Sequence, residues 1–168
     1  MRPRIGIEVT YASGDNCKSV CGHANTFDNL FPTNHFKFGA MDIGSWKNMV
    51  TYQAVFDVKP DAVSKFQVNF GILRLADRHD NWYRAGQVVY GQSGAANTAS
   101  SIGRELDVHY YRTIKEKFKF EIGAGHFWAG DYIGNAAANG NQIRLGTALF
   151  TPTGSGQNWG YLMGSVLF

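Results

Sequence analysis

The feature that most constrains the fold of this chain is a strict alternation of apolar and polar residues over segments of about ten residues. In residues 4–11, for example, Ile5, Ile7 and Val9 alternate with polar or small neighbours such as Glu8. Successive side chains of a β-strand point to opposite faces of a sheet. The alternation therefore predicts strands with one apolar and one polar face.

Six segments carry this pattern and predict about six strands. They are residues 4–11, 47–59, 64–75, 105–114, 118–128 and 159–168. Residues 142–150 alternate more weakly and would add a further hairpin arm. The segment length matches the roughly 9–11 residues that a tilted strand needs to cross a membrane.

The connections between these segments alternate between long and short. Residues 12–46, 76–104 and 129–158 are long, whereas 60–61 and 115–117 are short turns. Short turns on one side and long loops on the other are typical of outer-membrane barrels. The fold class predicted is all-β, an antiparallel transmembrane β-barrel to which residues 1–168 contribute about six strands as a single unit.

Aromatic residues near the predicted strand ends would suit the boundary between membrane and water. These residues are Tyr11, Trp46, Phe127, Trp128, Tyr132, Trp159 and Tyr161. We expect them to form girdles around the barrel.

Composition agrees with β structure and excludes several other classes. Aromatic residues make up 14% of the chain, with 20 Gly and only 4 Pro, which is neither disordered nor collagen-like. The apolar runs are far shorter than the roughly 20 residues of a membrane-spanning helix. The net charge of +3 is not clustered into a stripe, so we expect no nucleic acid partner.

A series of short motifs carries a family resemblance. The motifs are Tyr11-Ala12-Ser13-Gly14-Asp15, Thr26-Phe27-Asp28-Asn29-Leu30-Phe31-Pro32-Thr33-Asn34-His35, Trp46-Lys47-Asn48-Met49, Arg74-Leu75-Ala76-Asp77, Asp80-Asn81-Trp82-Tyr83, Gly103-Arg104-Glu105-Leu106-Asp107 and Gly125-His126-Phe127-Trp128-Ala129-Gly130-Asp131. In this order they resemble the C-terminal portion of the alginate-export family of outer-membrane porins, over about residues 11–133 and, more weakly, the last strand. The resemblance implies a bacterial outer-membrane channel for passive passage of polysaccharide, alginate-like, or small charged solutes, without a cofactor.

This chain is much shorter than such a barrel, which has many more strands. Met1-Arg2-Pro3-Arg4 leads directly into the first alternating segment without an apolar signal segment. A six-stranded sheet also has two open edges, and each unpaired backbone group in hydrocarbon costs several kcal/mol. We therefore expect missing N-terminal strands of a longer parent, or alternatively other copies of the chain, to close the barrel in the lipid bilayer.

Charged residues on the predicted polar face would line the lumen of such a barrel. They are Arg4, Glu8, Asp57, Lys65, Glu105, Asp107, Lys119 and Glu121. The simpler alternative is that these charges only pair with one another across strands. Arg4, Lys65 and Lys119 would attract an acidic polysaccharide or an anionic solute, although the acids in this set outnumber the bases.

No catalytic motif is recognisable, so we expect no enzyme activity. Glu105 with Asp107 is one candidate acid pair, but strand alternation alone often produces such pairs. The other candidates are His35 with Asp28, and His79 with Asp77 and Asp80. The His79 group would be able to hold a divalent cation, but three polar residues in a loop are usually solvated.

Cys17 and Cys21 occur as Cys-x-x-x-Cys-Gly-His. This spacing differs by one residue from a c-type haem attachment motif, and the ligands are too few for a closed zinc site. We expect a loop disulfide or two free thiols, and we predict no metal.

Two other classes fit the strand pattern. A small soluble β-barrel or sandwich that binds an apolar or sugar ligand would turn the apolar face inward. A plugged barrel with an adhesive or scaffold role would have the same strands without conduction. The mixture of charges and glycine on the polar face favours the membrane barrel with lipid outside.

Overall fold

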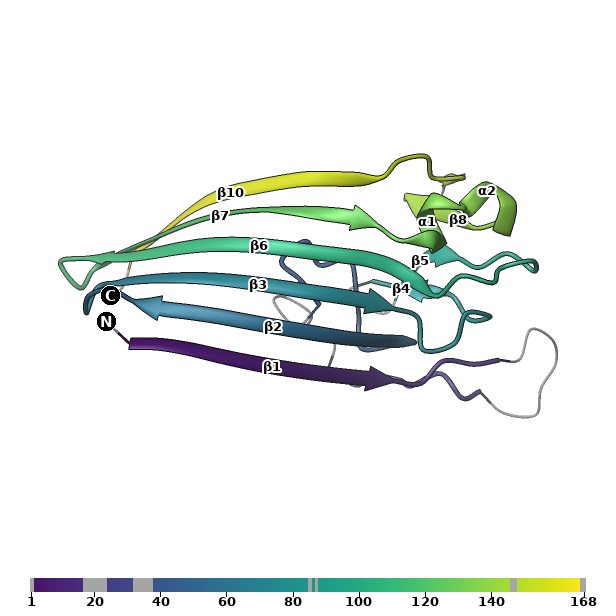
Figure 1. The fold of residues 1–168 in the computed structure, drawn as a ribbon, viewed down its shortest axis with the longest axis horizontal. Helices are drawn as coiled ribbons and strands as arrows, with labels where there is room; N and C mark the ends of the chain where they lie inside the picture. The colour runs from purple at the N-terminus through teal and green to yellow at the C-terminus, as the bar shows by residue number, and fades with distance from the viewer. Residues whose placement is uncertain are drawn as a thin grey trace.

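The fold is dominated by one large antiparallel sheet whose loops gather at one end (Figure 1). The computed structural model describes residues 2–16, 24–31, 38–84, 86, 88–145 and 148–166. The predictions for Cys17, Cys21 and His35 lie outside these residues. Within them, no helix is long and apolar enough to span a membrane.

The large sheet has six strands in the order β1-β2-β3-β6-β7-β10, all antiparallel to their neighbours. The strands are β1 (Arg2–Ala12), β2 (Met49–Lys59), β3 (Ser64–Arg74), β6 (Ser101–Ile114), β7 (Phe118–Ala129) and β10 (Gly156–Val166). Each strand overlaps one predicted segment, so the all-β antiparallel prediction is confirmed. β1 and β10 form the edges, and the described sheet is open.

The long loops contribute a second, smaller sheet and two short helices. Its strands, in the order β4-β5-β8-β9, are β4 (Trp82–Tyr83), β5 (Val89–Gln92), β8 (Gln142–Leu145) and β9 (Ala148–Phe150). Helices α1 (Asp131–Gly134) and α2 (Ala136–Asn139) precede β8. The weak alternation of residues 142–150 thus forms strands, but β8 pairs with β5 of the loops and not with the large sheet.

The predicted short turns lie at the opposite end of the sheet from the loops (Figure 1). Between β2 and β3 the carboxylate of Asp61 accepts a hydrogen bond from the backbone N–H of Val63 at 2.9 Å, which lowers the pKa of Asp61. Between β6 and β7, Lys115 and Glu116 both have positive φ, as in the tight hairpin turns that match the twist of paired strands. The predicted alternation of short and long connections is confirmed.

The two faces of the large sheet differ sharply in polarity. Cross-strand register places Ile5, Phe56, Val68 and Val108 in one row of the same face. On this face Ile7 is 83% and Leu162 is 76% exposed. A continuous apolar face of this size left open by the described chain is unusual for a protein that is surrounded by water.

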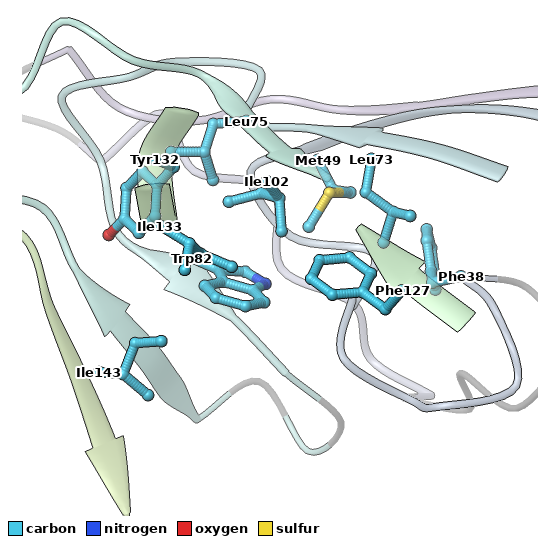
Figure 2. Close-up of a cluster of buried hydrophobic side chains, with 10 residues drawn as sticks. All are labelled: Phe38, Met49, Leu73, Leu75, Trp82, Ile102, Phe127, Tyr132, Ile133 and Ile143. Carbon is cyan, nitrogen blue, oxygen red and sulfur yellow. The ribbon is translucent and has the colours of Figure 1, made fainter. Parts of the chain in front are cut away.

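The hydrophobic core is confined to the end of the sheet where the loops fold over its polar face (Figure 2). The core side chains come from the loops and from the adjoining strand ends. They are Phe38, Met49, Leu73, Leu75, Trp82, Ile102, Phe127, Tyr132, Ile133 and Ile143. The core therefore attaches the loops to the sheet and leaves the opposite face of the strands uncovered.

The prediction of aromatic girdles is wrong for four of its seven residues. Phe127 and Tyr132 are buried in the core, while Trp159 and Tyr161 lie on the polar face opposite Gly125 and Gly123. A position near a strand end does not determine the face, which depends on the parity of the residue along the strand. The other three, Tyr11, Trp46 and Trp128, are exposed near the loop end of the sheet.

Buried asparagine side chains tie the long loops together. Asn48 donates to the carbonyls of Asp77 (3.0 Å) and Asn81 (2.9 Å) and accepts the N–H of Asp77 (2.7 Å). Asn141 donates to the side chain of Asn97 at 3.0 Å. Buried networks whose hydrogen bonds are satisfied hold loops in one arrangement. These asparagines therefore fix the long loops relative to one another.

We predict that a charge on the apolar face destabilises the folded protein in a membrane, whereas the same charge on the polar face does not. Ile7→Arg should lower the free energy of unfolding in lipid vesicles by about 2–4 kcal/mol, because the guanidinium would face hydrocarbon. Gly6→Arg is the matched control, since a side chain there meets nothing within 4 Å on the polar face. Urea titration in vesicles measures both. Equal losses for the two variants would contradict an outward apolar face.

Candidate functional site

All eight charged residues predicted for the lumen share the polar face of the large sheet. The cross-strand register pairs Arg4 with Asp57. A second row runs from Glu8 through Gln53 and Gly71 to Glu105. Lys65, Tyr111 and Glu121 form a further row. Asp107 lies two residues from Glu105 and Lys119 two residues from Glu121, so both lie on the same face. Within the set, Glu105 and Asp107 lie near the loops and form an acidic group, whereas Lys65 and Lys119 lie near the short turns, where Asp57 and Glu121 also lie, and form a basic group with Lys59.

The acidic group consists of Glu105 and Asp107, which are 0% and 1% exposed. Residues 38–41, in the connection before β2, fold back over them, behind the sheet in Figure 1. The backbone N–H of Met41 donates to Glu105 Oε1 at 2.9 Å, and that of Ala40 donates to Asp107 Oδ2 at 3.2 Å. The acids thus anchor a loop segment against the polar face.

Gly39 is required for this close approach. Its φ of +87° lies in the left-handed region, and a Cβ atom there would lie 2.2 Å from Glu105 Oε2. Sequence reasoning did not include residues 39–41 in the site, because no local pattern shows which strand residues a distant loop will meet. Gly39, which precedes Ala40 and Met41, is the one residue in the sequence that indicates a close approach of this loop to another segment.

Part of the acidic group has no compensating bond within the described chain. Glu105 Oε2 and Asp107 Oδ1 are buried without a hydrogen-bond partner among these residues. Burying such oxygens costs free energy. The two buried carboxylates therefore do not by themselves stabilise the sheet, and their hydrogen bonds to Ala40 and Met41 hold the folded-back segment.

Arg4 and Asp57 form an ion pair across β1 and β2. Arg4 Nη2 lies 2.7 Å from Asp57 Oδ2, and Arg4 Nε donates to the same oxygen at 2.7 Å. The simpler alternative of cross-strand pairing therefore describes these two residues. Glu8 accepts a hydrogen bond from Thr10 at 3.2 Å.

The basic group lies near the short turns and lines a hollow of about 550 Å³. Lys65 Nζ is 5.2 Å and Lys119 Nζ is 5.4 Å from the ring centre of Tyr111, and Lys59 lines the same hollow. Both lysines are thus cations over an aromatic ring. Among the residues that the structure describes, none of the three lysines forms an ion pair. Their positive charges are available to an anion that enters the hollow.

Between the two groups lie Trp159 and Tyr161 of β10. The hydroxyl of Tyr161 contacts His109 Nδ1 at 3.0 Å and donates a short hydrogen bond to Glu121. Glu121 also lines the hollow of the lysines, so one carboxylate lies among these three cations. The girdle prediction included both aromatic residues. Because Leu162 lies on the apolar face and side chains alternate along a strand, the odd-numbered Trp159 and Tyr161 belong on the polar face.

The residues of the predicted His79 group do not converge on one point in the described structure. His79 Nδ1 lies 3.1 Å from Asp77 Oδ1, but Asp80 accepts hydrogen bonds from Thr26 (2.6 Å) and Tyr83 (2.9 Å). Burial, together with the nearby Asp80 carboxylate, raises the pKa of Tyr83 well above its usual range, so it remains a donor.

Asp28 lies 3.5 Å from Lys47 Nζ, and its predicted partner His35 lies outside the described residues. Among the described residues, no group of three or more His, Cys, Asp or Glu side chains is arranged to hold a metal ion.

An open sheet with an apolar outer face, a charged inner face and inward-folded loops is the architecture that the resemblance implies. The family model described as alginate export matches residues 1–146. The chain belongs to the alginate-export family. The match includes all the motifs that carried the resemblance and ends before β10. A search of curated proteins finds no significant match.

Membership of the alginate-export family has two consequences for the site. The family is one of transport and export, not of enzymes, which agrees with the lack of a recognisable catalytic motif. The antiparallel all-β fold fits an outer-membrane transport barrel of this family.

We predict that removing the Glu105 carboxylate releases the folded-back segment. In Glu105→Ala the N–H of Met41 loses its charged acceptor, a bond worth about 1.5–3 kcal/mol, so exchange of this amide should accelerate about tenfold or more. Hydrogen exchange followed by mass spectrometry of peptides covering residues 38–45 measures the effect. Glu8→Ala, in the same row of the sheet, is the control and should leave this exchange unchanged. Unchanged exchange in Glu105→Ala would show that other contacts hold the segment.

Proposed function

We propose that residues 1–168 form a single unit of an outer-membrane β-barrel through which an acidic polysaccharide, alginate-like, or small charged solutes pass passively. The observation that carries this proposal is the polarity of the large sheet. Its apolar face is uncovered, and its polar face bears charges and the folded-back loop. A bacterial outer membrane provides the environment that this arrangement requires.

The apolar face supports contact with the lipid bilayer. Ile5, Ile7 and Leu162 are each more than three-quarters exposed, at 78%, 83% and 76%. A small soluble barrel that binds an apolar ligand would place these residues inside. In the described sheet the buried positions lie instead on the polar face, for example Asn69, Glu105 and His109.

The edges of the sheet support a larger assembly. β1 and β10 each pair with one neighbour only among the described strands. Exposed backbone N–H and C=O groups on such edges are too costly in hydrocarbon to be left unpaired. Additional strands, either from a longer chain or from other copies, would close the barrel and complete the lumen.

The lumen would have a basic region near the short turns and a region narrowed by the folded-back segment near the loops. An anionic solute that entered at the short-turn end would meet Lys59, Lys65 and Lys119 in the hollow around Tyr111. Toward the loops, the segment anchored on Glu105 and Asp107 would narrow the passage. In outer-membrane barrels the short turns face the periplasm, so export would begin at the basic group.

The folded-back segment also favours a second candidate, a plugged barrel with a scaffold role. Residues 38–41 cover part of the polar face, and the strand pattern of a non-conducting barrel would be identical. Conductance distinguishes these two functions, because a plugged lumen carries no sustained current.

We predict that the complete barrel conducts and that its ion preference depends on the basic group. In planar bilayers with a salt gradient, the reversal potential of the unaltered protein should indicate anion preference. The double variant Lys65→Glu and Lys119→Glu should shift it to the cation-selective sign, because four units of charge change inside the hollow.

Lys115→Glu with Lys117→Glu is the matched control, since it makes the same charge change in the exposed turn outside the hollow. An unaltered protein that prefers cations would contradict the assignment of the basic group. An absence of any conductance, in protein that shifts on heating in gels and fractionates with the outer membrane, would favour the plugged barrel.

A further inference from the structure

Four neighbouring rings lie together on the polar face, and we call this group the aromatic strip: Trp159, Tyr161, His109 and Tyr111. His109 contacts Trp159 as well as Tyr161, with ring centroids 5.9 Å apart for the first pair. The rings of Trp159 and Tyr161 are nearly parallel, at 6°, with centroids 5.5 Å apart. His109 lies 6.0 Å from Tyr161 and 6.1 Å from Tyr111. The strip thus runs from β10 across β7 to β6.

Two glycines of β7 make room for the strip. Gly125 pairs with Trp159 and Gly123 pairs with Tyr161. A Cβ atom on Gly125 would lie 2.4 Å from Trp159 Nε1, and one on Gly123 would lie 2.4 Å from Tyr161 Cε1. The two side chains therefore lie across the backbone of β7 instead of projecting straight from β10.

The orientation of the strip is also held by polar contacts. The hydroxyl of Tyr161 reaches His109 Nδ1 at 3.0 Å and bonds to Glu121. His109 is 0% exposed and only joins the other rings, so Trp159, Tyr161 and Tyr111 are the members of the strip with surface open to the space above the sheet. Trp159, Tyr161 and Tyr111 are accordingly half-buried, neither enclosed nor fully exposed.

A fixed ring face on the wall of a channel suits one class of solute. The C–H groups on the face of a pyranose ring pack against an aromatic ring by dispersion, and the hydroxyl groups remain in water. A small inorganic anion has no such C–H face. The ring centroids of the two partly exposed residues Trp159 and Tyr161 are 5.5 Å apart, which is comparable with the spacing of successive sugar units in a polymer.

The end of the strip near the short turns adds a charge preference. Lys65 and Lys119 both lie over Tyr111, at 5.2 and 5.4 Å. We propose that the aromatic strip is a binding track for the pyranose units of an acidic polysaccharide, with Lys65 and Lys119 pairing with a carboxylate of the sugar bound at Tyr111. This inference rests on the proposed function, in that the polar face lines a lumen.

The alternative role for the strip is purely structural. Aromatic rings packed over glycines would join β7 to β10 whatever the solute. Tyr111 is not part of this contact between β7 and β10, because it lies opposite Glu121 and not opposite a glycine. Its ring instead lies beneath the ammonium groups of Lys65 and Lys119. A structural joint gives no reason for this arrangement.

The test measures binding directly, with the full chain folded in detergent. The probes are a mannuronate oligomer, which is acidic, and a neutral mannose oligomer of the same length, and equilibrium dialysis gives the Kd of each. In Trp159→Leu the Kd for both oligomers should rise about tenfold, the usual cost of truncating an aromatic anchor. Trp159→Phe keeps a ring and should lose much less. Trp128→Leu, on the apolar face, is the matched control and should leave both Kd values unchanged.

Two further variants separate the ring faces from the charges. Gly123→Ala displaces the ring of Tyr161 without removing an aromatic atom and should weaken both oligomers, whereas Gly6→Ala, in open space on the same face, should not. Lys65→Gln with Lys119→Gln should weaken only the acidic oligomer and leave the neutral one unchanged.

Failure of this inference can be distinguished from failure of the proposed function. If the oligomers bind equally well to Trp159→Leu, Gly123→Ala and the unaltered protein, the strip is a structural joint and the inference is overturned, while conductance in bilayers would still support a channel. If Trp159→Leu does not fold, Trp159→Phe and Gly123→Ala decide the question. Loss of binding in Gly123→Ala without conductance in the unaltered protein would support the track and overturn passive passage.

Discussion

The structure depends on the antiparallel ladder that joins β1, β2, β3, β6, β7 and β10. The four inner strands pair on both sides and the edge strands β1 and β10 on one side, and this pairing fixes the register of all six. Since side chains alternate along each strand, one register makes one face apolar and the other polar over the whole sheet. A shift of one residue in β1, β2 or β3 would place charges among Ile5, Phe56 and Val68. The separation of faces, and with it the relation to the membrane, follows from this ladder.

The polar face is organised by what folds onto it. At the loop end, the hydrophobic core around Trp82 and Phe127 fastens the loops, and Asn48 connects them by hydrogen bonds. This support holds Ala40 and Met41 against Asp107 and Glu105. At the short-turn end nothing in the described chain covers the hollow, and the lysines stay open to solvent. The acids that anchor the loop segment and the lysines of the hollow are therefore located at different positions along the strands.

The alginate-export family gives this arrangement a functional context. In such a context the ion pair of Arg4 with Asp57 contributes to the wall, whereas Lys65 and Lys119 are free to act on a solute. The aromatic strip lies between the basic group and the constriction. A polymer that moved from the short turns to the loops would thus leave a region of charge attraction, pass over fixed ring faces, and reach the folded-back segment.

The strands, their order along the chain, the lengths of the connections and the polarity of each face were all predictable from the sequence, because alternation is a local property of the backbone. The shared face of Glu105, Asp107, Lys119 and Glu121 followed from the same parity. Local patterns do not encode contacts between distant segments. Only the tertiary structure showed that Gly39 lets a loop approach Glu105, that Trp159 lies across Gly125, and that β8 pairs with β5. These features depend on packing between residues far apart in the sequence, and a side chain's neighbours are determined only when the sheet and its loops have come together.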